Sequence, residues 1–207
     1  MKILIKENFL KRTINYLKEL LIGVDVNKID SKHLLRDLNT IHKFLIKNGI
    51  DLEQYPIEDA NYIGQGHFGR VWKIKGKDLI LKVSFGDWEE LQKAKRIKDY
   101  QDKNNLKHFA KMYVLKELKY TPGSAIYIKE LCYKLKPHVH DLLYYYLREL
   151  IKNDGKDIKL SERKDPIYIQ ALGIKNEMDK VGLYSLDLYG FNNIMQDKNG
   201  IYKVIDY

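Results

Sequence analysis

Residues 64–71 decide the fold, and they read Gly64-Gln65-Gly66-His67-Phe68-Gly69-Arg70-Val71. The three glycines follow the spacing G-x-G-x-x-G-x-V. Glycines without a Cβ let the backbone approach phosphate oxygens closely and present N–H groups to them. The stretch lies between strand-like segments, and no Gly-Lys-Ser/Thr follows it, which argues against a dinucleotide-binding fold and a P-loop. We therefore expect a phosphate-binding turn between strands.

Two apolar runs near these glycines predict a β-hairpin. Residues 71–74 and 79–83 are separated by the turn Gly76-Lys77-Asp78, and the second run carries Lys82. A glycine-rich hairpin followed by a lysine in an apolar strand resembles the start of the nucleotide lobe of protein kinases. The resemblance implies that Lys82 contacts the α- and β-phosphates of ATP and needs a carboxylate partner to hold it.

The helix expected near residues 88–100 offers two carboxylates for Lys82. Glu90 shares a helical stripe with apolar residues, whereas Glu89 pairs more readily with Lys93 on the outer face. We favour Glu90 as the partner, and Glu89 stays open as the alternative.

Further elements complete a small lobe over residues 57–132. Strands are expected at residues 111–115 and 125–131, with Thr121-Pro122-Gly123 as the turn between them, and Asp87 is expected to cap the helix. Four strands and one helix then make up this lobe.

Helices are expected on both sides of the small lobe. Apolar residues at helical spacing predict them at residues 8–21, 31–48, 142–151 and 166–181. A final hairpin is expected to pair residues 193–195 with 202–205. The chain would thus comprise an N-terminal helical element (1–56), the nucleotide-binding lobe (57–132) and a reduced helical lobe (133–207). Together with the resemblance to protein kinases, this order of elements implies an α+β, protein-kinase-like bilobal fold.

A second set of motifs lies in the reduced helical lobe. Leu186-Asp187, Asn192-Asn193-Ile194 and Ile205-Asp206 resemble the catalytic loop and metal-binding aspartate of protein kinases and of relatives such as aminoglycoside phosphotransferases. The resemblance implies that Asp187 accepts the proton of the attacking hydroxyl, that an asparagine oxygen binds Mg²⁺, and that Asp206 bridges metal and phosphates. Such oxygen donors suit Mg²⁺.

Two asparagines compete for the metal-binding role. Asn192 stands five residues after Asp187, as in the signature D-x-x-x-x-N, whereas Asn193 begins the strand and precedes Asp206 by thirteen residues, about the family separation. We favour Asn193, with Asn192 as the alternative.

The resemblance also implies a set of ATP contacts. Glu130 and Cys132 fall where kinases carry the hinge whose backbone pairs with adenine, although a buried strand end with a structural cysteine is equally compatible. The residues expected to contact ATP are Ile63, Gly64, Gly66, Phe68, Gly69, Val71, Lys82, Glu130 and Cys132.

The sequence departs from the kinase pattern at several points. Ser185-Leu186 stands where the family has His-Arg, and Ile80 stands where it usually has a small residue. Only Tyr207 follows Asp206, so the resemblance covers about residues 57–207 and does not extend to an activation segment or the later helices. Peptide specificity therefore cannot be carried over.

Composition sets the remaining expectations. The net charge of +9 would attract phosphate-rich partners, but the lysines are scattered, as on an ordinary solvated surface. The single Cys132 suits a reducing compartment, and no stretch approaches the roughly 18 apolar residues of a membrane span. We expect a cytoplasmic protein without membrane contacts.

His138 and His140 do not make a metal site by spacing, and a helix start capped by Asp141 is the favoured interpretation there.

Three functions remain open. The first is an ATP- and Mg²⁺-dependent kinase, similar to serine/threonine kinases, that transfers the γ-phosphoryl group to a hydroxyl of a protein or a small molecule. The second is a pseudokinase or regulatory nucleotide-binding module without turnover. The third is a basic nucleic-acid-binding protein on a kinase-like scaffold.

Overall fold

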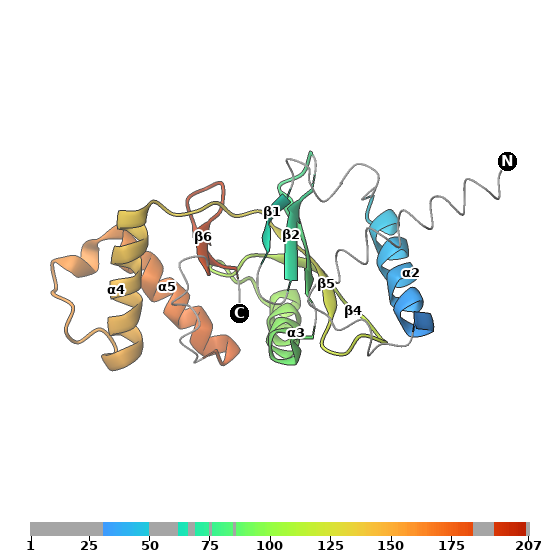
Figure 1. Ribbon diagram of the computed structural model, residues 1–207. Coiled ribbons are helices and arrows are strands. Elements are labelled where there is room, and N and C mark those ends of the chain that lie inside the picture. The colour runs from blue at the N-terminus through green and yellow to red at the C-terminus, as the bar shows by residue number, and fades with distance from the viewer. Residues whose placement is uncertain are drawn as a thin grey trace. The chain divides into compact units, whose positions relative to one another are not determined.

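The structure is a computed structural model that describes residues 31–49, 62–65, 69–74, 76–84, 86–183 and 193–205 (Figure 1). The chain is a mixed α+β protein that divides into two compact units. Unit 1 holds the described residues up to Gln92 together with Tyr113–Lys129, and unit 2 holds Lys93–Met112 with the described residues from Glu130 onward. The three-part division at residues 56 and 132 stays a prediction.

One sheet contains five of the described strands, in the order β1-β2-β3-β5-β4. Their bounds are Tyr62–Gln65 (β1), Gly69–Lys73 (β2), Leu79–Ser84 (β3), Met112–Glu117 (β4) and Ala125–Glu130 (β5). β2 pairs antiparallel with both β1 and β3. The four strands predicted by residue range are therefore present, and β1 is the strand before the glycine turn, for which no range was predicted. A four-residue strand with an internal glycine is too short to show a period-two pattern.

The β5 strand lies at the centre of the packing in unit 1. Residues 125–128 are all buried, as are Trp72 on β2 and Val83 on β3. A strand covered on both faces needs apolar residues in succession instead of alternation. This explains why the sequence at 125–128 runs apolar without a break.

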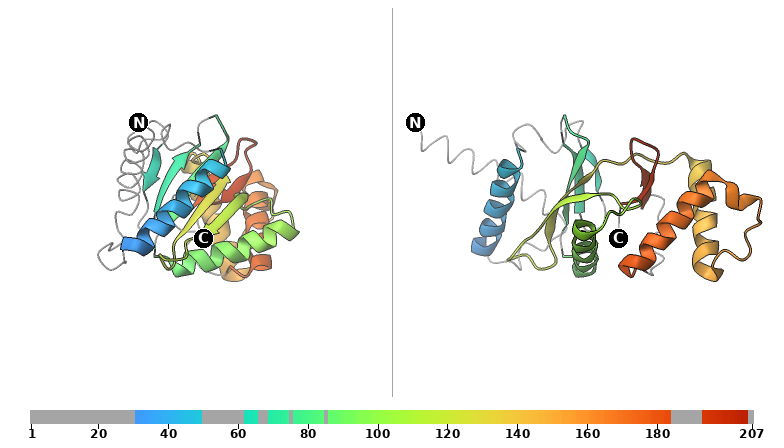
Figure 2. Two further views of the ribbon diagram at one scale, coloured as in Figure 1. Left: turned by 90° about the vertical axis from the view of Figure 1, so that its right-hand side faces the viewer. Right: turned by 180° about the vertical axis from the view of Figure 1, so that it is seen from behind.

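Two helices belong wholly or partly to unit 1. α2 spans Ser31–Lys47 and confirms the helix predicted at residues 31–48, whereas the one predicted at 8–21 lies outside the described residues. Figures 1 and 2 show α2 beside the end of β4. α3 spans Trp88–Lys103, and the boundary between the units falls within it. Asp87 Oδ1 accepts the Glu90 N–H at 2.8 Å, so the predicted cap is confirmed.

Unit 2 contains two long helices and a small sheet. α4 spans Pro137–Asn153, the 3₁₀ turn η3 spans Glu162–Lys164, and α5 spans Pro166–Val181. The strands β6 (Ile194–Gln196) and β7 (Tyr202–Val204) form the predicted hairpin, with Ile194 opposite Val204. Side chains from α4, α5, β6 and β7 share one buried apolar cluster.

The ends of α5 follow the sequence signals. Asp165 Oδ1 accepts the Ile167 N–H at 2.7 Å, Pro166 occupies the first turn, and Gly182 ends the helix with a φ of 68°. α4 ends at Asn153, two residues beyond the predicted range, and Asp154 after it adopts a left-handed conformation (φ 56°).

The expected start of α4 is wrong. Asp141 does not cap the helix: α4 begins at Pro137, and Asp141 lies in its second turn. Proline is favoured in a first helical turn because its missing N–H would have no partner there. This preference outweighs the capping signal of an aspartate four residues later.

In the described part of the chain, every helix is too short or too polar to cross a bilayer.

Candidate functional site

The glycine motif and Lys82 meet in one cross-strand row. Gly64 on β1 lies opposite Val71 on β2, and Val71 lies opposite Lys82 on β3. Residues directly opposite one another in a sheet point to the same face. The backbone register therefore places Gly64, Val71 and Lys82 on one face of three adjacent strands.

Gly69 occupies a position where the backbones of β2 and β3 come close together. A Cβ built on Gly69 would lie 2.6 Å from the carbonyl oxygen of Val83, well inside van der Waals contact. Glycine is therefore required here for strand pairing next to the turn, as well as for the phosphate approach that the sequence suggests.

Lys82 and Glu90 form an ion pair between β3 and α3. Lys82 Nζ lies 2.8 Å from Glu90 Oε1, and the two side chains are 11% and 12% exposed. The Ser84 hydroxyl donates to Glu90 Oε2 at 3.3 Å. Sequence reasoning missed Ser84, although its position two residues after Lys82 puts it on the same face of β3. The pairing favoured from the sequence is present, and Glu89 is exposed.

The connection from β4 to β5 holds the start of α3 in place. The Asp87 N–H donates to the Gly123 carbonyl at 3.0 Å, and the Gly86 N–H donates to Ser124 Oγ at 3.1 Å. Gly123 has a φ of +70°, and a Cβ on it would lie 3.0 Å from both the Gly86 carbonyl carbon and the Trp88 nitrogen. This close contact fixes the first turn of α3, which carries Glu90.

The backbone N–H of Glu130 forms a hydrogen bond within unit 2. It donates to the Lys111 carbonyl at 2.9 Å, and the Glu130 carboxylate accepts the Lys111 N–H at 3.1 Å and lies 3.5 Å from Lys203 Nζ. An adenine contact at Glu130 would therefore use its carbonyl oxygen. Cys132, the single cysteine of the sequence, is half-buried.

Asn193 is the described member of the expected metal-binding set. Its carbonyl oxygen accepts the Ile205 N–H at 2.9 Å, which places the Asn193 backbone beside the residue that precedes Asp206. The remaining predicted site residues lie outside the described residues; they are Gly66, Phe68, Asp187, Asn192 and Asp206. Their roles stay predictions.

Segment 107–110 supports the strand that leads to Asp206. The Val204 N–H donates to the His108 carbonyl at 2.8 Å, and the Ala110 N–H donates to the Val204 carbonyl at 2.9 Å. Glu177 on α5 accepts the N–H groups of Lys107 and His108 at 2.8 and 2.7 Å. The segment therefore links α5 to β7.

The His108 side chain is buried beside α5. Its Nδ1 lies 3.0 Å from the Tyr202 carbonyl, and a Cβ on Gly173 would lie 2.3 Å from its Nε2. Burial lowers the pKa of His108 below its ordinary value; Tyr202 and Glu177 oppose this shift, and Lys107 and Lys203 add to it. Sequence reasoning missed His108, because its partners lie far along the chain.

No group of three His, Cys, Asp or Glu side chains positioned to hold a metal ion occurs among the residues that the structure describes. His140 instead packs along α4 against Tyr144, with ring centroids 6.4 Å apart.

Comparison with known proteins assigns no family. No family model matches the chain, and no curated protein matches it either.

Proposed function

We propose that this protein is an ATP-dependent phosphotransferase with a protein-kinase-like bilobal fold. The observation that carries the proposal is the nearly buried Lys82–Glu90 pair, set in the same cross-strand row as Gly64 and Val71. A buried ion pair is weak evidence for stability, because its desolvation cost offsets much of its attraction. A role in holding a cation beside phosphate groups accounts for it better.

Each residue has a defined part in the proposed reaction. Lys82 Nζ, oriented by Glu90, contacts the α- and β-phosphates. The acceptor oxygen attacks the γ-phosphorus, the bond from that phosphorus to the β,γ-bridging oxygen breaks, and ADP leaves. Asp187 accepts the proton of the attacking hydroxyl. Catalysis of this type depends on positioning and on neutralising charge.

Magnesium fits the donor chemistry of the expected ligands. Amide and carboxylate oxygens, as offered by Asn193 and Asp206, are ligands that Mg²⁺ accepts together with phosphate oxygens and water. When bound, Mg²⁺ neutralises negative charge on the phosphates. The acceptor is a hydroxyl of a protein or a small molecule, and the proposed setting is the cytoplasm.

Calorimetric titration with Mg–ATP tests the binding step. Lys82→Ala is expected to weaken ATP binding about tenfold or more, because a charge-assisted contact to phosphate is lost. Lys73→Ala is the matched control, because Lys73 is an exposed lysine on the neighbouring strand. Equal affinity of the two variants would argue against the proposal.

Transfer from γ-labelled ATP separates an enzyme from a binding module. Asp187→Ala is expected to abolish labelling of acceptors while ATP binding is retained. A wild-type protein that binds ATP but labels no acceptor in a lysate would favour the pseudokinase.

A further inference from the structure

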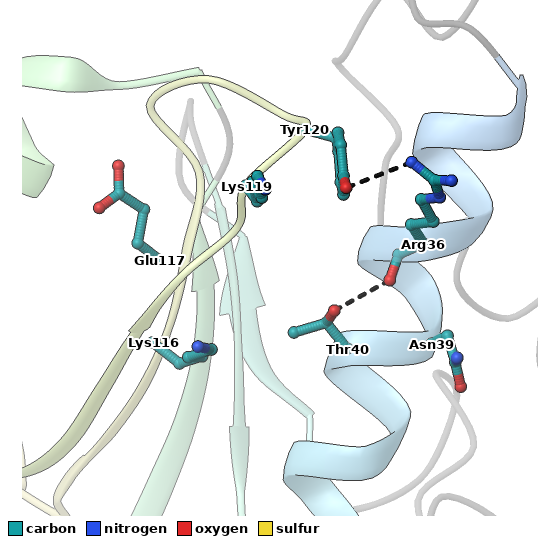
Figure 3. Close-up of a pocket in the computed structure, with 7 residues that line it drawn as sticks. All are labelled: Arg36, Asn39, Thr40, Lys116, Glu117, Lys119 and Tyr120. Carbon is teal, nitrogen blue, oxygen red and sulfur yellow. Dashed lines mark hydrogen bonds between the residues drawn. The ribbon is translucent and has the colours of Figure 1, made fainter.

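A polar pocket lies between α2 and the end of β4, apart from the residues of the proposed nucleotide site. Its volume is about 400 Å³, within the usual range for small-molecule sites. Figure 3 shows α2 forming one wall and β4 with the following turn forming the other. The lining residues are Arg36, Asn39, Thr40, Lys116, Glu117, Lys119 and Tyr120.

The lining carries an excess of positive charge. Arg36, Lys116 and Lys119 are exposed, and within the part of the chain that the structure describes none of them is in an ion pair. Lys82 and other described lysines, by contrast, pair with carboxylates. Glu117 is the single carboxylate of the lining, and Figure 3 shows it turned away from α2.

Two of these cations lie over the ring of Tyr120. The Arg36 guanidinium carbon lies 5.4 Å from the ring centroid, and Lys119 Nζ lies 5.5 Å from it. Arg36 Nη1 also donates to the Tyr120 hydroxyl at 3.3 Å. Both cations are attracted by the ring although they repel each other. An anion between them would relieve that repulsion.

A buried carboxylate fixes the two walls of the pocket. Asp37, on α2, is 1% exposed. It accepts hydrogen bonds from the Lys119 N–H at 3.1 Å, the Tyr120 N–H at 2.9 Å and the Thr121 hydroxyl at 2.7 Å. These charge-assisted bonds hold the turn against the helix. Asp37 uses its oxygens to hold the turn, and it does not itself line the pocket.

We propose that this pocket binds the phosphate monoester group of a ligand. The guanidinium of Arg36 offers a planar fork of donors that matches phosphate oxygens, and Lys116 and Lys119 supply further positive charge for a dianion. Asn39 adds an exposed amide. The group comes from a small phosphorylated metabolite or from a phosphorylated protein side chain. A pocket with three cations, rather than an extended basic strip, favours such a compact ligand over nucleic acid.

Titration of the ¹⁵N-labelled full chain at fixed ionic strength tests the site. The probes are inorganic phosphate, a phosphoserine peptide and its unphosphorylated form. Saturable shifts are expected at residues 36–40 and 116–121 with phosphate and with the phosphopeptide. Inorganic phosphate could also bind at the proposed nucleotide site. Because each chemical-shift change is assigned to a residue, binding at the pocket is distinguished from binding there.

Three charge-neutralising variants sharpen the test. Arg36→Gln and Lys119→Gln are each expected to weaken binding about tenfold. Lys47→Gln is the control, because Lys47 is exposed in the last turn of α2 and outside the pocket. Arg36 and Lys119 are both exposed, so their variants should fold, and thermal melting followed by circular dichroism checks this.

Each outcome decides the proposal. Tighter binding of the phosphopeptide assigns the group to a protein partner, and tighter binding of inorganic phosphate assigns it to a small ligand; either supports the site. The proposal is overturned by an absence of saturable shifts up to about 10 mM probe. Equal weakening by Lys47→Gln, or equal binding of the phosphorylated and unphosphorylated peptides, overturns it as well.

Discussion

Two of the buried charged side chains of unit 1, Asp37 and Lys82, do different work. Asp37 is compensated by three neutral donors from one neighbouring turn, and together they tie α2 to the sheet. Lys82 is paired with an opposite charge, Glu90, across β3 and α3. The first arrangement is explained by structure alone. In the second arrangement, the desolvation of two charges offsets much of their attraction, so the pair adds little stability. Function is therefore the better explanation for it.

The largest effect is expected from Asp37→Ala. The change leaves three donors without their acceptor and should lower the free energy of unfolding by about 4 kcal/mol. Urea denaturation followed by circular dichroism measures it. Asp37→Asn, which keeps one acceptor oxygen, should lower the free energy of unfolding by less. If Asp37→Ala lowers it by no more than an ordinary surface substitution does, these hydrogen bonds do not hold α2.

Lys82→Met should cost about 3 kcal/mol, because it leaves Glu90 as an unpaired carboxylate that is nearly buried. The double variant Lys82→Met/Glu90→Met should recover to within about 1 kcal/mol of wild type, since both charges are removed together. The same denaturation measurement tests this. A double variant that stays about 3 kcal/mol less stable than wild type would mean that the pair is mainly structural.

Gly123→Ala should cost about 2 kcal/mol, because it combines a left-handed conformation with a close approach to the start of α3. Gly76→Ala is a matched control. Gly76 has the same φ of +70°, but nothing lies within 4 Å of its added Cβ. The difference in melting temperature between the two variants isolates the close contact. If both variants lower the melting temperature equally, the close contact of Gly123 does not position α3.

The smallest expected effect on stability concerns His108, in unit 2. Its pKa is lowered in the folded protein because burial disfavours the charged ring. The unfolded chain therefore binds the proton more readily. This contribution to stability is complete above about pH 6.5 and is lost as pH falls from there through the folded pKa.

Denaturation at pH 7.5 and 5.5 should show a pH dependence of about 1 kcal/mol that His108→Gln reduces. His138→Gln, at an exposed position, should leave it unchanged. If both variants keep the wild-type pH dependence, another group is responsible for it.

Local signals allowed the sequence to predict much of the fold. The cap at Asp87, the bounds of α5 and the closing hairpin all depend on neighbours within a few residues. The Lys82–Glu90 pair was also predictable, because the glycine spacing marks the strand and helical periodicity selects the carboxylate.

Contacts between distant residues were not predictable from one sequence. Asp37 finds its partners more than eighty positions away, and His108 packs against Gly173 and Tyr202. No local pattern marks an aspartate in a helix as a buried acceptor. The cationic pocket depends on the same tertiary contact between α2 and the turn after β4, so the scattered charges along the chain do not indicate it.

Labelling with an ATP analogue that carries a reactive acyl group on its γ-phosphate tests the central claim most directly. If Lys82 Nζ lies beside the phosphates, peptide mapping should find the acyl group on Lys82, and an excess of unmodified ATP should suppress the labelling. Labelling spread over exposed lysines such as Lys73, with no effect of added ATP, would contradict the account.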